Sequence, residues 1–187
     1  MTEPTHNGRP IIKERVTSLG LYCTAKEAYD MWQADPEGVT VLDVRTPEEW
    51  VFTGHAPMAV LIPFAFLAYQ WDDEKKAFPW SLSPDFVPQV LARFKPDDTL
   101  LVTCRSGGRA AMAINMLAKA AGFTRAYNIL DGMEGDRVHD PDSVFDGMRR
   151  RNGWQMSGLP WTYALDPATM TLPASEATNL QHGNDAD

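Results

Sequence analysis

Cysteine is scarce in this sequence, which has Cys23 and Cys104 as its two thiols among 187 residues. Two thiols cannot form a disulfide framework, so a reducing compartment is the default expectation. These cysteines and the four scattered histidines lack the spacing of zinc ligands. We therefore expect no metal and no cofactor.

Positive charge is also in short supply, because 17 lysines and arginines stand against 25 acidic residues, for a net charge of −8. Such a chain cannot offer the broad basic surface that nucleic acids require. The longest apolar run, residues 56–69, is interrupted by Pro57 and Pro63 and is too short to cross a bilayer. With no secretory signal at the start, we expect a cytoplasmic protein, although a processed periplasmic form would have the same sequence.

What the sequence does contain is an alternation of short apolar segments and amphipathic ones. Thr24 and Glu27 have the spacing of a capping box, and Gly122 follows the apolar segment 109–121 where a helix C-terminal glycine belongs. The predicted strands are 39–42, 60–62, 99–103 and 126–130, and helices are predicted after residues 24, 46, 83 and 108. This order predicts an α/β fold with a mainly parallel central sheet flanked by helices.

We expect a single domain over residues 19–163, preceded by a polar N-terminal arm (1–18) and followed by a flexible tail (164–187). The pattern of strands and helices dissolves over about residues 131–152, which we interpret as an irregular insertion.

The chemistry points to Cys104, which directly follows the predicted strand 99–103. A cysteine at the carboxyl end of a parallel strand lies where α/β proteins bind ligands. The sequence Ser-Gly-Gly that follows Arg105 allows successive backbone amides to curl around the sulfur, and a helix N-terminus adds to their field. Together with Arg105 and Arg109, these donors favour the thiolate over the thiol, whereas the alternative is a buried, inert cysteine at a glycine turn.

A cradled anionic sulfur suits two chemistries, phosphate ester hydrolysis and sulfur transfer. Cysteine phosphatases place five residues between the cysteine and an arginine, whereas here the fifth residue after Cys104 is already Arg109. The shorter loop suits a single sulfur atom. Sulfite leaving from thiosulfate is a weak base, so sulfur transfer needs no general acid, and the loop has no histidine beside it.

Three blocks resemble the rhodanese family, specifically its single-domain members, over about residues 21–163. They are residues 43–56 (DVRTPEEWVFTGHA), 104–110 (CRSGGRA), and 152–160 (NGWQMSGLP). The resemblance implies a rhodanese-like fold in which Cys104 carries a persulfide. It implies further that the loop residues cradle the outer sulfur and bind the donor: Arg105, Ser106, Gly107, Gly108 and Arg109. The segment between Leu130 and Asn152 is longer than in typical members, which leaves the acceptor open.

The implied function is a sulfurtransferase that moves sulfane sulfur from thiosulfate, or a similar small anionic donor, to cyanide or a thiol, including a protein thiol. We expect no nucleic-acid partner and no membrane insertion. One alternative is a non-catalytic partner-binding module on a rhodanese-like scaffold. Another is a cysteine-dependent phosphatase or arsenate reductase.

Five other residues are weighed beside Cys104. Asp43 ends a predicted strand, so its carboxylate either supports the site by pairing with Arg105 or another loop arginine, or caps a helix at the surface. Arg45 and Glu49 are interpreted as fold-stabilising. His55 is interpreted as a structural turn residue. Cys23 is interpreted as a small apolar residue before the first helix, with resolution of a Cys104 persulfide as the alternative.

Overall fold

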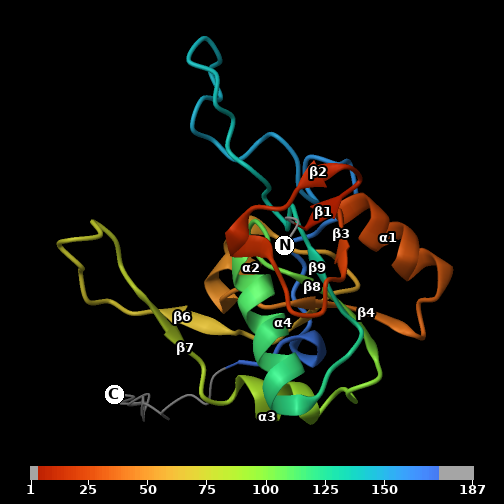
Figure 1. The fold of residues 1–187 in the computed structure, drawn as a ribbon. Helices are drawn as coiled ribbons and strands as arrows, with labels where there is room; N and C mark the ends of the chain where they lie inside the picture. The colour runs from red at the N-terminus through yellow and green to blue at the C-terminus, as the bar shows by residue number, and fades with distance from the viewer. Residues whose placement is uncertain (1–3, 173–187) are drawn as a thin grey trace, which may run out of the picture.

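The centre of the molecule is a five-stranded parallel sheet in the order β3-β9-β8-β4-β5. This computed structural model describes residues 4–172. The strands are β1 (Thr5–His6), β2 (Arg9–Pro10), β3 (Tyr22–Cys23), β4 (Val39–Asp43), β5 (Val60–Leu61), β6 (Ala65–Leu67), β7 (Trp80–Leu82), β8 (Thr99–Thr103) and β9 (Ala126–Ile129). The helices are α1 (Ala25–Ala34), α2 (Pro47–Thr53), α3 (Phe86–Leu91) and α4 (Gly108–Ala121), with 3-10 turns at η1 (Lys13–Arg15) and η2 (Pro167–Thr169). The predicted α/β fold with a mainly parallel sheet is confirmed (Figure 1).

Local sequence signals explain where the helices begin and end. Thr24 and Glu27 form the expected capping box at α1, and Thr46 and Glu49 form a second one at α2. Helix α4 ends at Gly122, whose φ of 72° is the left-handed conformation that terminates helices. These caps fix the directions in which α1, α2 and α4 leave the sheet.

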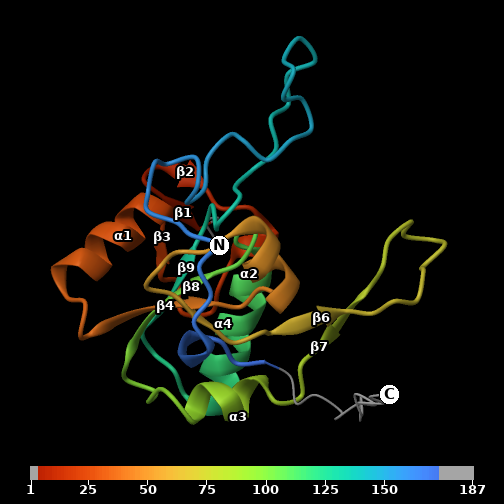
Figure 2. The same cartoon turned by 180° about the vertical axis from the view of Figure 1, so that it is seen from behind.

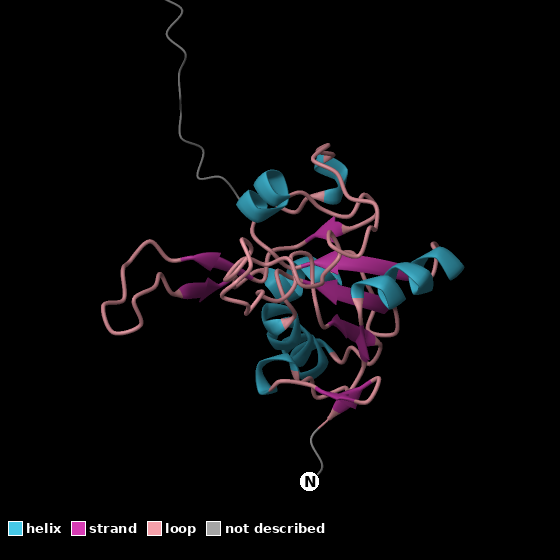
Figure 3. Ribbon diagram, turned by 90° about the horizontal axis from the view of Figure 1, so that it is seen from above, coloured by secondary structure: helices cyan, strands magenta, loops and turns pink. Residues whose placement is uncertain are grey.

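Two apolar clusters lie on opposite faces of the sheet, with helices on both sides (Figure 3). Successive residues of a strand point to opposite faces, so Leu42 of β4 packs with α3 and α4, while Val41 packs with α1 and α2. Trp50 of α2 and Trp154 are fully buried in the second cluster. Strands β4 and β8 are therefore apolar on both faces, as central parallel strands are.

Two segments project from the body of the molecule (Figures 1 and 2). One is the hairpin of β6 and β7 with its loop. The other is the loop between Gly135 and Asn152, which we call the insertion loop. Its two limbs are joined by isolated bridges from Arg137 to Arg149 and from Val138 to Asp146. The insertion loop lies within the segment of about residues 131–152 that the sequence analysis interprets as an irregular insertion.

The N-terminal segment is more ordered than its polar composition indicates. Residues 4–18 include the short β1–β2 hairpin and η1. Ile11 is buried, and the Asn128 side chain donates to the carbonyl of Arg15 at 2.9 Å, which ties the arm to β9. The arm is therefore packed against the edge of the sheet that carries the candidate site.

Part of the predicted C-terminal tail also contacts the body. The amide of Thr171 donates to the carbonyl of Leu61 at 2.9 Å, and Arg93 donates to the carbonyl of Ala168 at 3.2 Å. The rest of the tail, residues 173–187, lies outside the described residues. Between residues 4 and 172, no helix is long and apolar enough to cross a bilayer.

Candidate active site

Cys104 lies one residue beyond β8, at the edge of the sheet where all five parallel strands end. The backbone amide of Gly107 donates to its Sγ at 3.2 Å. Gly107 has a φ of 88°, and a Cβ there would collide with the carbonyl oxygen of Leu130. Only glycine adopts this conformation without strain, and it turns the amide toward the sulfur before α4 begins. Cys104 as a whole is 1% exposed, so the sulfur lies at the bottom of the loop 104–109, the active loop.

The floor of the active loop is a short segment that follows β9. The amide of Met133 donates to the carbonyl of Cys104 at 2.9 Å, and the amides of Glu134 and Gly135 donate to the carbonyl of Arg105 at 3.0 and 3.2 Å. These bonds satisfy the carbonyl groups of Cys104 and Arg105, the first two residues of the active loop.

The C-terminal block of the sequence closes onto this floor. The amide of Trp154 donates to the carbonyl of Gly132 at 2.8 Å. At the base of the insertion loop, the Asn152 side chain accepts from the amide of Asp136 at 2.7 Å and donates to its carboxylate at 3.0 Å. Gly135 and Gly153 therefore lie against each other in space, although the insertion loop separates them in the sequence.

Arg109 reaches the site, but its guanidinium is shared with the fold. It donates two hydrogen bonds of 2.6 Å to the two carboxylate oxygens of Glu49. It also lies 4.4 Å from the centre of the Trp80 ring, within the range of a cation–π contact. Burial opposes ionisation of both partners, yet their hydrogen bonds and opposite charges raise the pKa of Arg109 and lower the pKa of Glu49. Sequence reasoning missed this link between α2, the active loop and β7.

Arg105 is exposed, and within residues 4–172 no carboxylate lies within ion-pair distance of it. The adjacent Glu134 is half-buried; burial raises its pKa, and the positive charge of Arg105 opposes that rise. Ser106 is also partly exposed at the mouth of the loop. Arg105 is therefore a cation of the active loop that no carboxylate among residues 4–172 pairs with.

The predicted partner of Asp43 is wrong. Asp43 is fully buried and pairs with the equally buried Arg45, whose Nε lies 2.9 and 3.0 Å from the two carboxylate oxygens. Arg45 also donates to the Thr53 hydroxyl at 2.7 Å and to the carbonyl of Gly54 at 2.8 Å. The turn after β4 brings residues 43 and 45 together, so neither a loop arginine nor a helix cap is needed. Asp43 therefore holds Arg45, which ties the turn after β4 to the C-terminal end of α2, and among residues 4–172 no ion pair joins Asp43 to an arginine of the active loop.

The remaining candidates are structural. His55 stacks on Trp50 with ring centres 3.7 Å apart, and burial lowers its pKa. Cys23 is buried in β3, where burial raises the pKa of its thiol, so it is poorly suited to reaction.

Trp71 contacts Phe78 within the loop of the β6–β7 hairpin, whereas Trp80 of β7 reaches the active loop through its contact with Arg109. Across residues 4–172, no three His, Cys, Asp or Glu side chains gather in a way that could hold a metal ion.

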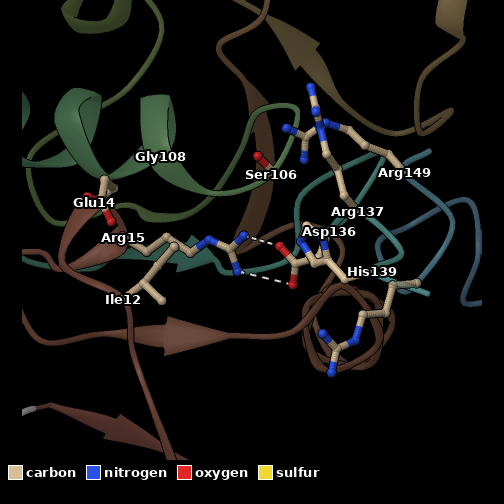
Figure 4. A pocket seen from close by; sticks show the side chains of 10 residues that line it. Ile12, Glu14, Arg15, Ser106, Gly108, Asp136, Arg137, His139 and Arg149 are labelled. Atoms are coloured by element: carbon tan, nitrogen blue, oxygen red, sulfur yellow. Dashed lines mark hydrogen bonds and ion pairs between the residues drawn. The ribbon is translucent and has the colours of Figure 1, made fainter. Parts of the chain in front are cut away.

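A cavity of about 420 Å³ opens beside the active loop, between the N-terminal arm and the insertion loop (Figure 4). Ser106 and Gly108 form its wall on the side of the active loop. Arginines dominate its other walls: Arg15, Arg137, Arg149 and Arg151. From the sequence alone, the basic run 149–151 is interpreted as a solvated face or, alternatively, as attracting an anionic donor or an acidic partner, and its spacing does not place it beside the loop.

Comparisons with known proteins agree on one family. The profile of the Rhodanese-like domain matches residues 24–137. The chain is 39% identical over 95 residues to "Thiosulfate sulfurtransferase 16, chloroplastic" of Arabidopsis thaliana, covering 51% of this chain and 71% of that one. It is 30% identical over 143 residues to "Uncharacterized protein RP600" of Rickettsia prowazekii, covering 75% and 95%. The crystal structure of Rv0390 from M. tuberculosis superposes with a TM-score of 0.55 at 28% identity, covering 76% of this chain and 99% of that one.

Proposed function

Because the chain belongs to the rhodanese family, we propose that it is a sulfurtransferase that carries sulfane sulfur as a persulfide on Cys104. The observation that supports this most directly is the contact of the Gly107 amide with Cys104 Sγ at 3.2 Å. A main-chain donor aimed at a sulfur stabilises negative charge there without any proton transfer.

In the first half-reaction, the Cys104 thiolate attacks the outer sulfur of thiosulfate or a similar sulfane donor. A bond forms between Cys104 Sγ and that sulfur, the sulfur–sulfur bond of the donor breaks, and sulfite leaves with the electron pair. Arg105, exposed at the mouth of the loop, attracts the anionic donor. Arg109 adds positive charge that Glu49 partly neutralises.

In the second half-reaction, a nucleophilic acceptor attacks the outer sulfur of the persulfide. The acceptor, cyanide or a thiolate, forms a bond to that sulfur, and the electron pair of the broken bond returns to Cys104 Sγ. The enzyme is restored, so the kinetics should be ping-pong. No cofactor takes part in either step.

Intact mass spectrometry tests the proposal. After incubation with thiosulfate, the wild type should gain one sulfur, about 32 Da, as a persulfide. Cys104→Ser should gain nothing, while Cys23→Ser should still gain the sulfur because Cys23 is buried in the sheet. Loading that persists in Cys104→Ser, or that is lost in Cys23→Ser alone, would refute the assignment.

The same samples separate the alternatives. A protein that never gains mass but still binds partners is a non-catalytic module. Turnover of an aryl phosphate or of arsenate, without a persulfide, would instead indicate a phosphatase or an arsenate reductase. The loop length argues against these, since Arg109 is the fifth residue after Cys104.

A further inference from the structure

The cavity beside the active loop concentrates positive charge in a protein whose net charge is −8. Four arginines line it against two carboxylates, Glu14 and Asp136. Asp136 is committed to Arg15, with which it forms an ion pair (Figure 4). Such a gathering of like charges at the surface costs stability by mutual repulsion.

Among residues 4–172, most of these arginines form no ion pair. Within the described part of the chain, no carboxylate lies within ion-pair distance of Arg137, Arg149 or Arg151. Burial lowers the pKa of Arg149, and the positive charges of Arg105 and Arg137 lower it further, while the charges of Glu134 and Asp136 oppose this shift. An anion that entered the cavity would relieve this repulsion, so the arrangement is suited to an anionic ligand.

The insertion loop holds these side chains in place. Arg137 and Arg149 form an isolated antiparallel bridge, and residues paired in this way carry their side chains on the same face. Figure 4 shows the two side chains together, on the side of Ser106. Arg149 is fixed further by a hydrogen bond of 2.6 Å to the carbonyl of Gly135, in the floor of the active loop. The position of these arginines is therefore tied to the position of the active loop.

We propose that this cavity is a subsite for the anionic groups of the sulfur acceptor, and that the acceptor is a small thiol carrying carboxylate or phosphate groups. This inference rests on the proposed function. Thiosulfate has only five heavy atoms, whereas a cavity of about 420 Å³ has the size of a site for a larger small molecule. Ser106 and Gly108, which line the cavity, flank the residue whose amide contacts the sulfur, Gly107. An acceptor anchored by its anionic groups is therefore held against the active loop that carries the persulfide.

The chemical step balances without a further reactant. The acceptor thiol loses its proton to solvent, and its thiolate attacks the outer sulfur of the Cys104 persulfide. The new bond joins the two sulfurs of the acceptor persulfide, and the electron pair of the broken bond returns to Cys104 Sγ. The arginines bind and orient the acceptor and take no part in bond making.

The test compares two acceptors that share the same thiol, glutathione and its diethyl ester, in which ethyl groups mask both carboxylates. With persulfide-loaded, full-length protein, we expect kcat/KM for glutathione to exceed that for the ester. In the double variant Arg137→Gln/Arg151→Gln, this ratio should fall at least about fivefold, because two exposed cations that face the ligand are removed. Both side chains are exposed, so the substitutions leave the core intact.

Arg150→Gln is the matched control. Arg150 lies between Arg149 and Arg151 in the sequence and is exposed, but it faces Phe145 and lines a different cavity. Its substitution should leave the acceptor ratio unchanged. Inorganic phosphate should compete with glutathione in the wild type and less so in the double variant.

The outcomes distinguish a failure of the proposed function from a failure of the subsite assignment. If the wild type gains no mass with thiosulfate, the proposed function fails, and the subsite assignment falls with it. If loading is normal but both acceptors discharge the persulfide equally well, only the subsite assignment is overturned. A double variant whose KM for thiosulfate rises while the acceptor ratio stays constant would also overturn it, because the arginines would then serve the donor.

Discussion

Arg109 of the active loop and Glu49 of α2 are joined by two parallel hydrogen bonds of 2.6 Å, although they lie 60 residues apart in the sequence. Their side chains are only 11% and 18% exposed, so the pair is largely shielded from solvent. The same Glu49 caps α2 through the amide of Thr46 at 3.1 Å. One carboxylate thus fixes both the start of a helix and the second arginine of the active loop.

Glu49→Gln should separate these two roles, because glutamine still caps the helix but cannot neutralise Arg109. We expect a loss of about 1–3 kcal/mol in the free energy of unfolding at pH 7, since a charged partner is left without its counterion. Folding lowers the pKa of Glu49, so its contribution is fully present above the unfolded value of about 4.3 and is lost as the pH falls below it. Urea unfolding of both proteins from pH 7 to pH 3 measures the difference.

Glu48→Gln is the control for this series, because Glu48 lies in the same helical turn but is exposed. It should change stability by no more than about 0.5 kcal/mol. A difference between wild type and Glu49→Gln that stays constant down to pH 3 would show that the ion pair does not stabilise the fold.

Gly107→Ala should remove the amide from the sulfur, whereas Gly108→Ala should be harmless. The φ of 88° at Gly107 costs an L-residue about 1–2 kcal/mol, and a Cβ there also collides with Leu130. Gly108 is helical, and its Cβ would meet only the carbonyl oxygen of Glu14 at 3.8 Å. We expect Gly107→Ala to lose stability and persulfide loading, and Gly108→Ala to keep both and to gain about 0.4–1 kcal/mol. Normal loading in Gly107→Ala, measured by intact mass, would contradict the role of this amide.

Asp43→Ala should destabilise the protein by about 3–5 kcal/mol, because it leaves Arg45 buried without its counterion. Both residues are 0% exposed. Replacing both charges, as in Asp43→Ala/Arg45→Met, should recover at least half of the loss, since no unpaired charge then remains. Thermal unfolding of the two variants gives the comparison; a double variant that is no more stable than the single one would show that the burial of Arg45 is not the cause.

Arg105→Ala should raise the KM for thiosulfate about tenfold, as expected for the loss of one charge-assisted contact with an anionic donor. The KM for a neutral organic trisulfide donor should change little. Arg125→Ala is the control, because Arg125 is exposed beside the start of β9, at the opposite edge of the sheet from Cys104. Equal effects on the charged and the neutral donor would defeat the role of Arg105 in donor binding.

The sequence alone determined those features that depend on neighbours in the chain. The caps at Thr24 and Gly122, the buried strand before Cys104 and the glycines after it act within a few residues, so their physics is local. The fold class followed from the alternation of strands and helices, and the central thiol followed from its place between a strand and a helix.

Only the tertiary structure decided which charges meet. Asp43 pairs with Arg45 instead of a loop arginine, and Arg109 pairs with Glu49, which lies 60 residues away in the sequence. The insertion loop, which the sequence shows only as a gap in the pattern, placed Arg137 and Arg149 beside Ser106. The strength of such pairs depends on distance and burial, and both are fixed by the packing of segments far apart in the chain, so residue types and spacing could not supply them.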